Sequence, residues 1–429
     1  MGSVVLEPAK RNPRRKLHAL GVYCGLAAAV WLAAAEAPIK LVAFAVTPTV
    51  IAFMMVFGAF LSRWSIPALV RGTAATFADA RQAPHLIVWG LMAGCLWAVA
   101  DLLTIYAIRD IGLSIAFPIW NTNSLIGIVW GALLFGELRR AGWLRWLGVA
   151  GGAVVIFAAA IVLTSVSISY APSAHALHGV AAALGAGLLF GSQYIPYRKA
   201  YISGMNPLTF LTFFTFGEMA TMSILAICFS GGVLPFWHEL LQDRTILFWP
   251  LLGGFFWVIG DLFQNYAAKY VGISRGIPLS NTNQIWGLLW ATMVFGELHG
   301  LSAGIYMRVI GGTLLMTAGA IAIACASTSE SEYTSWKAAA QRECDLYDID
   351  PAYVHAQIDG AEPDAGERRR GWADRLLIGG ATLIFVALAM LARVPEITLH
   401  WGWLTGLSLL MFAVLAGGAV ALWRTTRFR

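Results

Sequence analysis

The 429-residue sequence carries little charge. Only 12% of its residues are Asp, Glu, Lys or Arg, whereas 59% are hydrophobic, and the mean hydropathy is +0.70. This composition provides too little polar surface to cover a water-soluble globule. It therefore excludes a soluble domain and predicts a polytopic membrane protein.

The sequence also lacks the residue patterns of common catalytic and metal sites. It has no P-loop, no HExxH, no GxSxG, no cluster of histidines and no CxxC pair. These absences argue against an enzyme, and we expect no cofactor and no metal site. Five isolated cysteines are interpreted as small packing residues: Cys24, Cys95, Cys228, Cys325 and Cys344.

Long apolar runs recur throughout the chain. Each is about 20 residues long, which is the length that a helix needs to cross the hydrocarbon core. The runs are continuously apolar, whereas the strands of a membrane barrel alternate, so the predicted fold is an all-α polytopic membrane helix bundle. Twelve spans are expected, at 17–38, 42–61, 86–107, 113–136, 143–164, 178–197, 208–229, 247–268, 273–296, 304–325, 376–392 and 402–423.

The net charge of +6 indicates membrane topology rather than nucleic-acid binding, because the basic residues gather beside the predicted spans. They alternate with loops of almost no charge, which places both termini in the cytoplasm and the chain in the cytoplasmic (inner) membrane. The N-terminal run also imitates a signal peptide, but it is too long for one. The basic residues on the predicted cytoplasmic side include Lys10, Arg11, Arg14, Arg15, Lys16, Arg63, Arg71, Arg81, Arg139, Arg140, Arg145, Arg198, Lys199, Lys269, Arg275, Arg368, Arg369, Arg370, Arg424, Arg427 and Arg429.

An internal duplication is visible at an offset of 160 residues. Residues 89–138 align with 249–298, and 20 of the 50 positions are identical. Each copy contains five predicted spans, an odd number, so the second copy should cross the membrane in the opposite sense. Inverted repeats of this kind are typical of transporters that work by alternating access.

The duplication predicts five segments along the chain. The first and last parts are a cytosolic basic N-terminus and a C-terminal two-helix hairpin with a basic tail, and the hairpin is a candidate contact for a homo-oligomer. A cytosolic polar segment with a short helix after Pro351 precedes the hairpin. The boundaries are 1–16 for the N-terminus, 17–164 and 178–325 for the two repeats, 326–373 for the polar segment and 374–429 for the hairpin and tail.

Each repeat carries Pro-x-x-Asn-Thr-Asn inside an otherwise apolar span. Polar side chains in hydrocarbon must face the bundle or a wet cavity. Helical geometry places Asn123, Gly127 and Trp130 on one stripe, with an equivalent stripe in the second repeat. An amide, a gap and an indole suit a polyol, because amides bind hydroxyls and an aromatic face covers C–H groups. The alternative is that these residues pack neighbouring helices together. The candidate substrate-binding residues are Asn121, Thr122, Asn123, Trp130, Asn281, Thr282, Asn283, Trp290, Gln193, Trp97 and Trp257.

Four carboxylates lie within the predicted spans: Glu36, Asp101, Glu218 and Asp261. Asp101 and Asp261 correspond in the two repeats, so we expect them at mirrored gates. Glu36 and Glu218 have no acidic counterpart, and a single buried carboxylate is what a proton carrier requires. Structural ion pairing remains the alternative for the two aspartates. Glu137 and Glu297, at helix ends, are expected to have structural roles.

The duplication, Pro-x-x-Asn-Thr-Asn and the terminal Phe-Gly-Glu-Leu together resemble the drug/metabolite transporter superfamily. Within it, GISRGIPLSNTNQIWGLLWATMVFGEL and FGSQYIPYRK are most similar to the glucose/ribose uptake and rhamnose branch, which shares EamA-like repeats. This resemblance covers about residues 17–325. It implies secondary transport of a monosaccharide or similar small polar metabolite, by symport with H⁺.

Two other functions are compatible with the sequence. An exporter of drugs or amino-acid-like metabolites would use the same fold, but polar amides in the cavity favour a sugar. A membrane receptor built on a transporter core would need only binding, with residues 326–373 reporting the bound state. Neither the substrate nor the direction of transport follows from these motifs.

Overall fold

The computed structural model describes residues 13–134, 142–170, 173–271, 273–326, 329–352, 354 and 370–426. Some expectations lie outside the described residues: the basic N-terminus up to residue 12, Glu137, Arg139, Arg140, most of the short helix after Pro351, Arg368, Arg369, Arg427 and Arg429. Within these ranges the chain is helical and contains no strand, as the apolar runs predict. The described part of the chain includes nine helices long and apolar enough to cross a membrane. The all-α polytopic bundle is thus confirmed.

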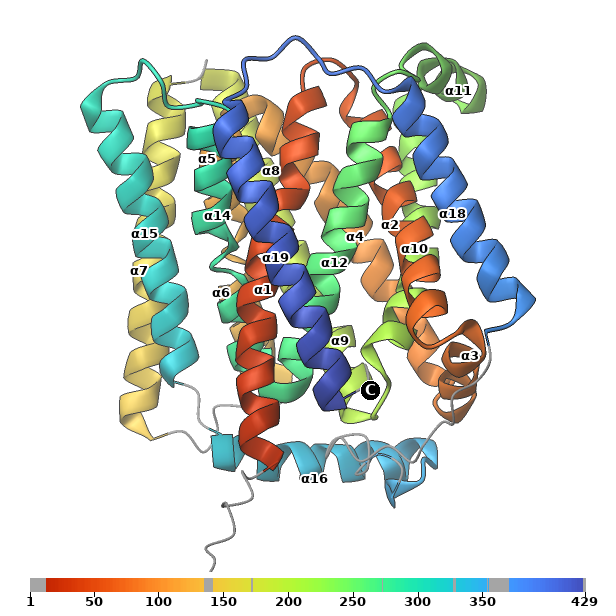
Figure 1. Ribbon diagram of the computed structural model, residues 1–429. Helices are drawn as coiled ribbons and strands as arrows, with labels where there is room; N and C mark the ends of the chain where they lie inside the picture. Colours follow the sequence, from red (N-terminus) through yellow and green to blue (C-terminus); the bar gives the residue numbers. More distant parts are fainter. Residues whose placement is uncertain are drawn as a thin grey trace, which may run out of the picture.

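The long helices stand side by side in one bundle (Figure 1). The first part of the chain forms α1 (Pro13–Val42), α2 (Pro48–Val70), α3 (Thr73–Gln82), α4 (His85–Ile111), α5 (Leu113–Trp120), α6 (Asn123–Leu134) and α7 (Trp143–Tyr170). The second part forms α8 (Ser173–Ser192), α9 (Tyr194–Ile202), α10 (Pro207–Phe229), α11 (Val233–Gln242), α12 (Phe248–Val271), α13 (Ile273–Ser280), α14 (Asn283–Leu289), the π-helix η1 (Trp290–Val294) and α15 (Ala303–Ala326). The remaining helices are α16 (Ser329–Tyr347), α18 (Trp372–Leu391) and α19 (Trp401–Thr426).

Two helix crossings bring backbones into close contact through glycine. A Cβ atom at Gly58 of α2 would lie 2.1 Å from a carbonyl oxygen of α12, and one at Gly254 of α12 would lie 1.9 Å from a carbonyl of α2. At Gly94 of α4 and Gly217 of α10 the corresponding distances across the α4–α10 crossing are both 2.0 Å. Only glycine permits this approach. Gly94 and Gly254 are separated by the 160-residue offset of the sequence duplication, and Gly58 and Gly217 by one residue less.

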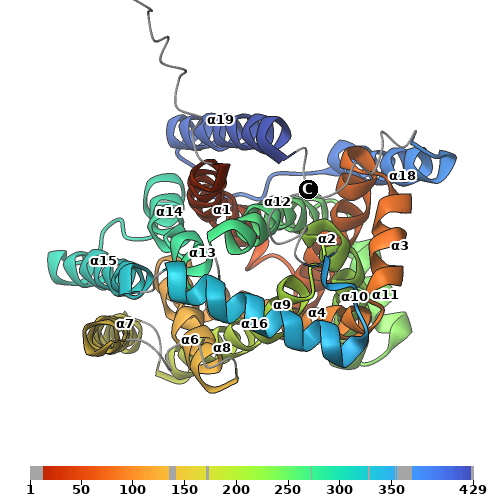
Figure 2. The same cartoon turned by 90° about the horizontal axis from the view of Figure 1, so that it is seen from below.

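The helix α16 lies across one end of the bundle, where α1 begins and α19 ends (Figures 1 and 2). Glu343 of α16 forms an ion pair with Lys199 of α9. The ring of Tyr347 stacks on His85, with 3.7 Å between the ring centroids. The sequence patterns indicated only a short helix in this polar segment, because α16 lacks the long apolar run that identifies a membrane span.

The two C-terminal spanning helices pack against different parts of the bundle. α18 contacts α2 and α12, whereas α19 contacts α1 and η1. Residues 392–400 connect them across the end of the bundle opposite α16 (Figure 1). The expected hairpin is therefore an open one, and Figure 2 shows its two helices apart from each other along the same outer side of the bundle.

Candidate substrate site

Two broken helices carry the repeated Asn-Thr-Asn motif. The spans expected at 113–136 and 273–296 are interrupted at residues 121–122 and 281–282, in keeping with the interpretation of the repeated motif as two mirrored half-helices. Pro118 and Pro278 lie just before the breaks. Proline weakens a helix there because it lacks an N–H group and clashes with the preceding turn. The motif thus marks a pair of half-helices.

Polar side chains satisfy carbonyl groups near the breaks. Asn121 Nδ2 donates to the Phe117 carbonyl at 2.9 Å, and Thr282 Oγ1 donates to the Leu279 carbonyl at 2.8 Å. Thr122 is half-buried and faces α8. Part of each triplet is therefore used to end a half-helix, since carbonyls at a helix end have no helical donor.

The two breaks touch each other in the interior of the bundle. Asn281 Nδ2 donates to Asn123 Oδ1 at 2.6 Å and is also hydrogen-bonded to Ser124 Oγ. Asn281 belongs to the second copy of the motif and Asn123 to the first. All three residues are buried. The structure therefore brings together two motifs that are 160 residues apart in sequence.

Several buried amide atoms around this contact have no hydrogen-bond partner among the described residues. They are Oδ1 of Asn283, both polar side-chain atoms of Gln284, and Oε1 of Gln193. Gly191 brings the end of α8 against the first break, because a Cβ there would lie 2.8 Å from the Asn123 carbonyl oxygen. A buried amide without a partner costs about 1–3 kcal/mol. Hydroxyl groups of a bound ligand would satisfy these atoms.

An aromatic cluster contains two of the predicted site residues. Trp97 of α4 and Trp257 of α12 meet edge to face, with 5.3 Å between their ring centroids. Phe190 stacks on Trp257 at 5.9 Å. Trp97 is almost fully buried, whereas Trp257 is half-buried. Of the two indoles, Trp257 has the more accessible face.

The gap expected beside each Asn-Thr-Asn triplet is filled by protein. A Cβ at Gly127 would lie 2.7 Å from the ring of Tyr194, and one at Gly287 would lie 3.1 Å from the ring of Phe117. The prediction of an open gap on the stripe is therefore wrong. These glycines admit aromatic rings from neighbouring helices, which is the helix-packing role considered as the alternative.

The two tryptophans on the predicted stripes differ in environment. Trp130 Nε1 donates to Ser192 Oγ at the end of α8, at 3.1 Å. Trp290 is buried and begins the π-helix η1. A π-helix adds one residue to a turn and so rotates the residues that follow. The symmetry of the two stripes ends at this point.

A buried ion cluster lies beside the aromatic cluster. Arg63 of α2 is 1% exposed, and its Nη2 atom is 2.8 Å from Asp261 Oδ2 on α12. Its Nη1 atom forms an ion pair with Glu218 of α10. The guanidinium lies over the ring of Phe214, 4.2 Å from its centroid, and 5.7 Å from the ring of Trp97.

The sequence placed Arg63 in a loop beside the membrane, after a span ending at residue 61. This is wrong, because α2 continues to Val70 and Arg63 points into the bundle. Two further residues that the sequence did not single out support Asp261. Asn265 Nδ2 donates to Asp261 Oδ1 at 2.9 Å, and the Tyr197 hydroxyl donates to the same atom at 3.4 Å.

The other two carboxylates in the spans have no cation paired with them among the described residues. Both carboxylate oxygens of Glu36 and Oδ2 of Asp101 are buried without a hydrogen-bond partner there. Asp101 is close enough to Glu36, Glu218 and Arg63 to interact with each electrostatically. The four predicted acids thus share one buried region with the guanidinium of Arg63. They outnumber it four to one.

Comparison with known proteins finds similarity to sugar transport and sugar uptake proteins. The family model for sugar transport proteins matches residues 211–343. The chain is 27% identical over 235 residues to the glucose uptake protein GlcU of Staphylococcus xylosus, covering 52% of this chain and 76% of that protein.

Two further relatives carry related names. A putative sugar uptake protein of Listeria innocua is 25% identical over 239 residues, covering 55% of this chain and 77% of that protein. A probable glucose uptake protein of Staphylococcus aureus is 25% identical over 249 residues, covering 54% and 78%. Together these similarities support a sugar-transporter family, as the sequence motifs indicated.

Proposed function

We propose that this protein is a secondary active transporter that imports a monosaccharide, or a similarly small polar metabolite, by alternating access coupled to protons. The observation that carries the proposal is the contact between the two Asn-Thr-Asn breaks, with unpartnered amide atoms of Asn283, Gln284 and Gln193 around it. Amides donate and accept hydrogen bonds, which a polyol requires. Trp257 offers a partly exposed ring for the C–H face of a sugar.

Alternating access is supported by the paired construction of the bundle. The α2–α12 and α4–α10 crossings use glycines that correspond in the duplication. We propose that the repeats at 17–164 and 178–325 are inverted, within the drug/metabolite transporter superfamily. Small rearrangements at the two equivalent crossings would then expose the central site to either side in turn.

The orientation in the membrane follows from charge. α1 begins and α19 ends at the end covered by α16 (Figure 1). We place that end in the cytoplasm and the protein in the cytoplasmic membrane, because basic residues favour the cytoplasmic side. The opposite end, where α5 begins, then faces outward.

Proton coupling is assigned to the buried acids. Charges buried without compensation cost several kcal/mol. With one guanidinium for four acids, proton binding by the cluster would remove part of this cost. We propose Glu36 and Glu218 as proton carriers, and Asp101 and Asp261 as gate residues. When Glu218 binds a proton, its ion pair with Arg63 would be lost, whereas the ion pair between Arg63 and Asp261 would remain.

Uptake of radiolabelled hexoses, pentoses and deoxyhexoses into proteoliposomes tests this function. The protein should accumulate at least one of these sugars when an inward proton gradient is imposed. Without a gradient it should only equilibrate the sugar. No protein-dependent uptake of any of them would refute the sugar assignment, and efflux alone would favour an exporter.

A further inference from the structure

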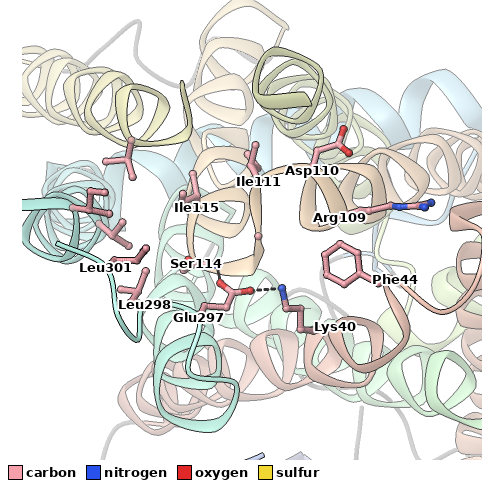
Figure 3. A pocket seen from close by; sticks show the side chains of 14 residues that line it. Lys40, Phe44, Arg109, Asp110, Ile111, Ser114, Ile115, Glu297, Leu298 and Leu301 are labelled. Carbon is pink, nitrogen blue, oxygen red and sulfur yellow. Dashed lines mark hydrogen bonds and ion pairs between the residues drawn. The ribbon is translucent and has the colours of Figure 1, made fainter. Parts of the chain in front are cut away.

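A cavity of about 290 Å³ lies beside the end of α1 and the start of α5, at the end of the bundle opposite α16. Figure 3 shows the side chains that line it. This cavity is called the vestibule below. Its volume is close to the lower end of small-molecule sites, roughly 300–1,000 Å³. Its polar and aromatic lining includes Lys40, Phe44, Arg109, Asp110, Ser114 and Glu297.

Seven of the lining residues of the vestibule are aliphatic, and the charges of the others suit a neutral ligand that has both apolar and polar faces. Two of its side chains are basic, Lys40 and Arg109, and two are acidic, Asp110 and Glu297. The formal charges therefore balance, which favours neither anions nor cations. Phe44 is 65% exposed and lies 5.5 Å from Lys40 Nζ, measured to the ring centroid. An exposed ring beside hydrogen-bonding groups matches the apolar and hydroxyl faces of a sugar.

One wall of the vestibule is formed by three donors that contact the Glu297 carboxylate, and Figure 3 marks the contact with Lys40. Lys40 Nζ lies 2.5 Å from Glu297 Oε1. The backbone N–H groups of Leu113 and Ser114, at the start of α5, donate to the same carboxylate at 2.9 and 2.8 Å. A carboxylate at a helix N-terminus with an ammonium partner makes strong, charge-assisted hydrogen bonds.

This contact joins parts of the chain that are distant in sequence. Lys40 is near the end of α1, and Leu113 and Ser114 begin α5, whereas Glu297 follows η1. From here α5 runs to the first Asn-Thr-Asn break, and η1 and α14 lead back to the second. Separating Glu297 from α5 would therefore separate the two half-helices that lead to the amide contact.

We infer that the vestibule is a first binding site for a neutral polyhydroxylated ligand, and that the Glu297 contacts are a gate between it and the Asn-Thr-Asn breaks, additional to the gate role proposed for Asp101 and Asp261. This inference rests on the proposed transport function. Ligand hydroxyls can bond to Lys40 and Glu297 in place of their bonds to each other. A ligand that binds the separated groups better shifts the equilibrium toward the open gate.

The gate is tested without any sugar. Ser114→Cys places a thiol at the contact itself, on a residue that is 3% exposed, and a membrane-impermeant thiol reagent is added to the side facing the vestibule. Labelling of the native cysteines is measured in the parent protein and subtracted. Glu297→Gln, which removes the charge and keeps the size, should speed labelling of residue 114 several-fold. Glu239→Gln, on α11, should leave the rate unchanged.

Lys40→Gln provides a second variant, because it removes the ion pair and leaves both backbone hydrogen bonds in place. It should give a smaller acceleration than Glu297→Gln. Both variants should elute as single species in size-exclusion chromatography. If the folded variants are labelled no faster than the parent protein, the Glu297 contacts do not act as a gate.

The binding site is tested by removing the exposed ring. Phe44→Ala should raise the KM for uptake by about two- to tenfold, the range that an aromatic contact provides, without changing kcat. Phe157→Ala removes an equally exposed phenylalanine, 64% against 65%, from α7 and should change neither. Equal KM values for the Phe44→Ala and Phe157→Ala variants would contradict sugar binding in the vestibule. If the parent protein moves no sugar at all, the transport proposal fails. The labelling rates still show whether the Glu297 contacts act as a gate.

Discussion

Arg63 places a guanidinium inside the bundle, where it is neutralised by Glu218 and Asp261 from two other helices. Removing one partner of such a buried set leaves uncompensated charge. Arg63→Met should therefore lower the free energy of unfolding by about 3–5 kcal/mol, measured by thermal or chemical unfolding in detergent. Arg308→Met, at an exposed position of α15, should change it little.

A triple variant separates charge from packing at this position. Replacing Glu218 by Gln and Asp261 by Asn in the Arg63→Met protein removes the carboxylates that Arg63 had neutralised. Most of the lost stability should return. If the triple variant is as unstable as Arg63→Met, the ion cluster does not account for the effect and Arg63 acts through packing against Phe214 and Trp97.

Proton coupling is also expected to depend on single residues. Gln imitates a protonated carboxyl group and cannot titrate. Glu218→Gln should abolish accumulation of sugar against its gradient while preserving exchange at equal concentrations, and Glu36→Gln should do the same if Glu36 carries the proton. Radiolabelled uptake and counterflow in proteoliposomes measure the two properties, with Glu239→Gln as the control. Accumulation by both variants would leave Asp101 or Asp261 as the carrier, whereas a parent protein that never accumulates sugar would indicate facilitated diffusion.

Among the elements, the two glycine crossings determine how closely the spanning helices approach. A methyl group at Gly94 would collide with the Phe214 carbonyl oxygen, because its Cβ would lie 2.0 Å away. Gly94→Ala should therefore destabilise the protein by about 1–3 kcal/mol, as overpacking commonly does, and slow transport. Gly311→Ala, on α15, has no atom within 4 Å of the added Cβ and should be neutral or slightly stabilising. Equal unfolding temperatures for the two variants would contradict this account of the crossing.

The sequence predicted most elements but not how they pack together. Apolar length identified the spans, and Pro-x-x-Asn-Thr-Asn identified the two places where helices break. Periodicity could not show that Tyr194 fills the space beside Gly127, because that contact comes from a different part of the chain. α16 was missed since its composition resembles that of a polar loop.

Arg63 illustrates the same limit. A charge near the end of an apolar run ordinarily marks the edge of the membrane, so the second span was ended too early. The apolar residues 66–70 that follow Arg63 could have indicated a longer helix. No local pattern, however, predicts that its partners are 155 and 198 residues away.

For the whole molecule, the question is whether the duplicated core can transport without the C-terminal helices α16, α18 and α19. α16 is bound to the core through Lys199 and His85, and α18 and α19 cover its outside. We expect a protein lacking residues 326–429 to fold and to transport, because the Asn-Thr-Asn contact and the ion cluster lie within residues 36–283. Monodispersity and initial uptake rates measure this. Ligand binding without flux in the full-length protein would instead favour a receptor.

We propose that the two Asn-Thr-Asn breaks form one substrate site. The most direct test is the affinity of the transported sugar for Asn123→Ala and Asn283→Ala, measured by calorimetry on purified protein, with the exposed amide variant Gln341→Ala as control. Each single variant should lose a hydrogen bond in a desolvated site, weakening binding by about 1–3 kcal/mol, or roughly tenfold or more. Unchanged affinity in both variants would contradict the account and return these residues to helix packing.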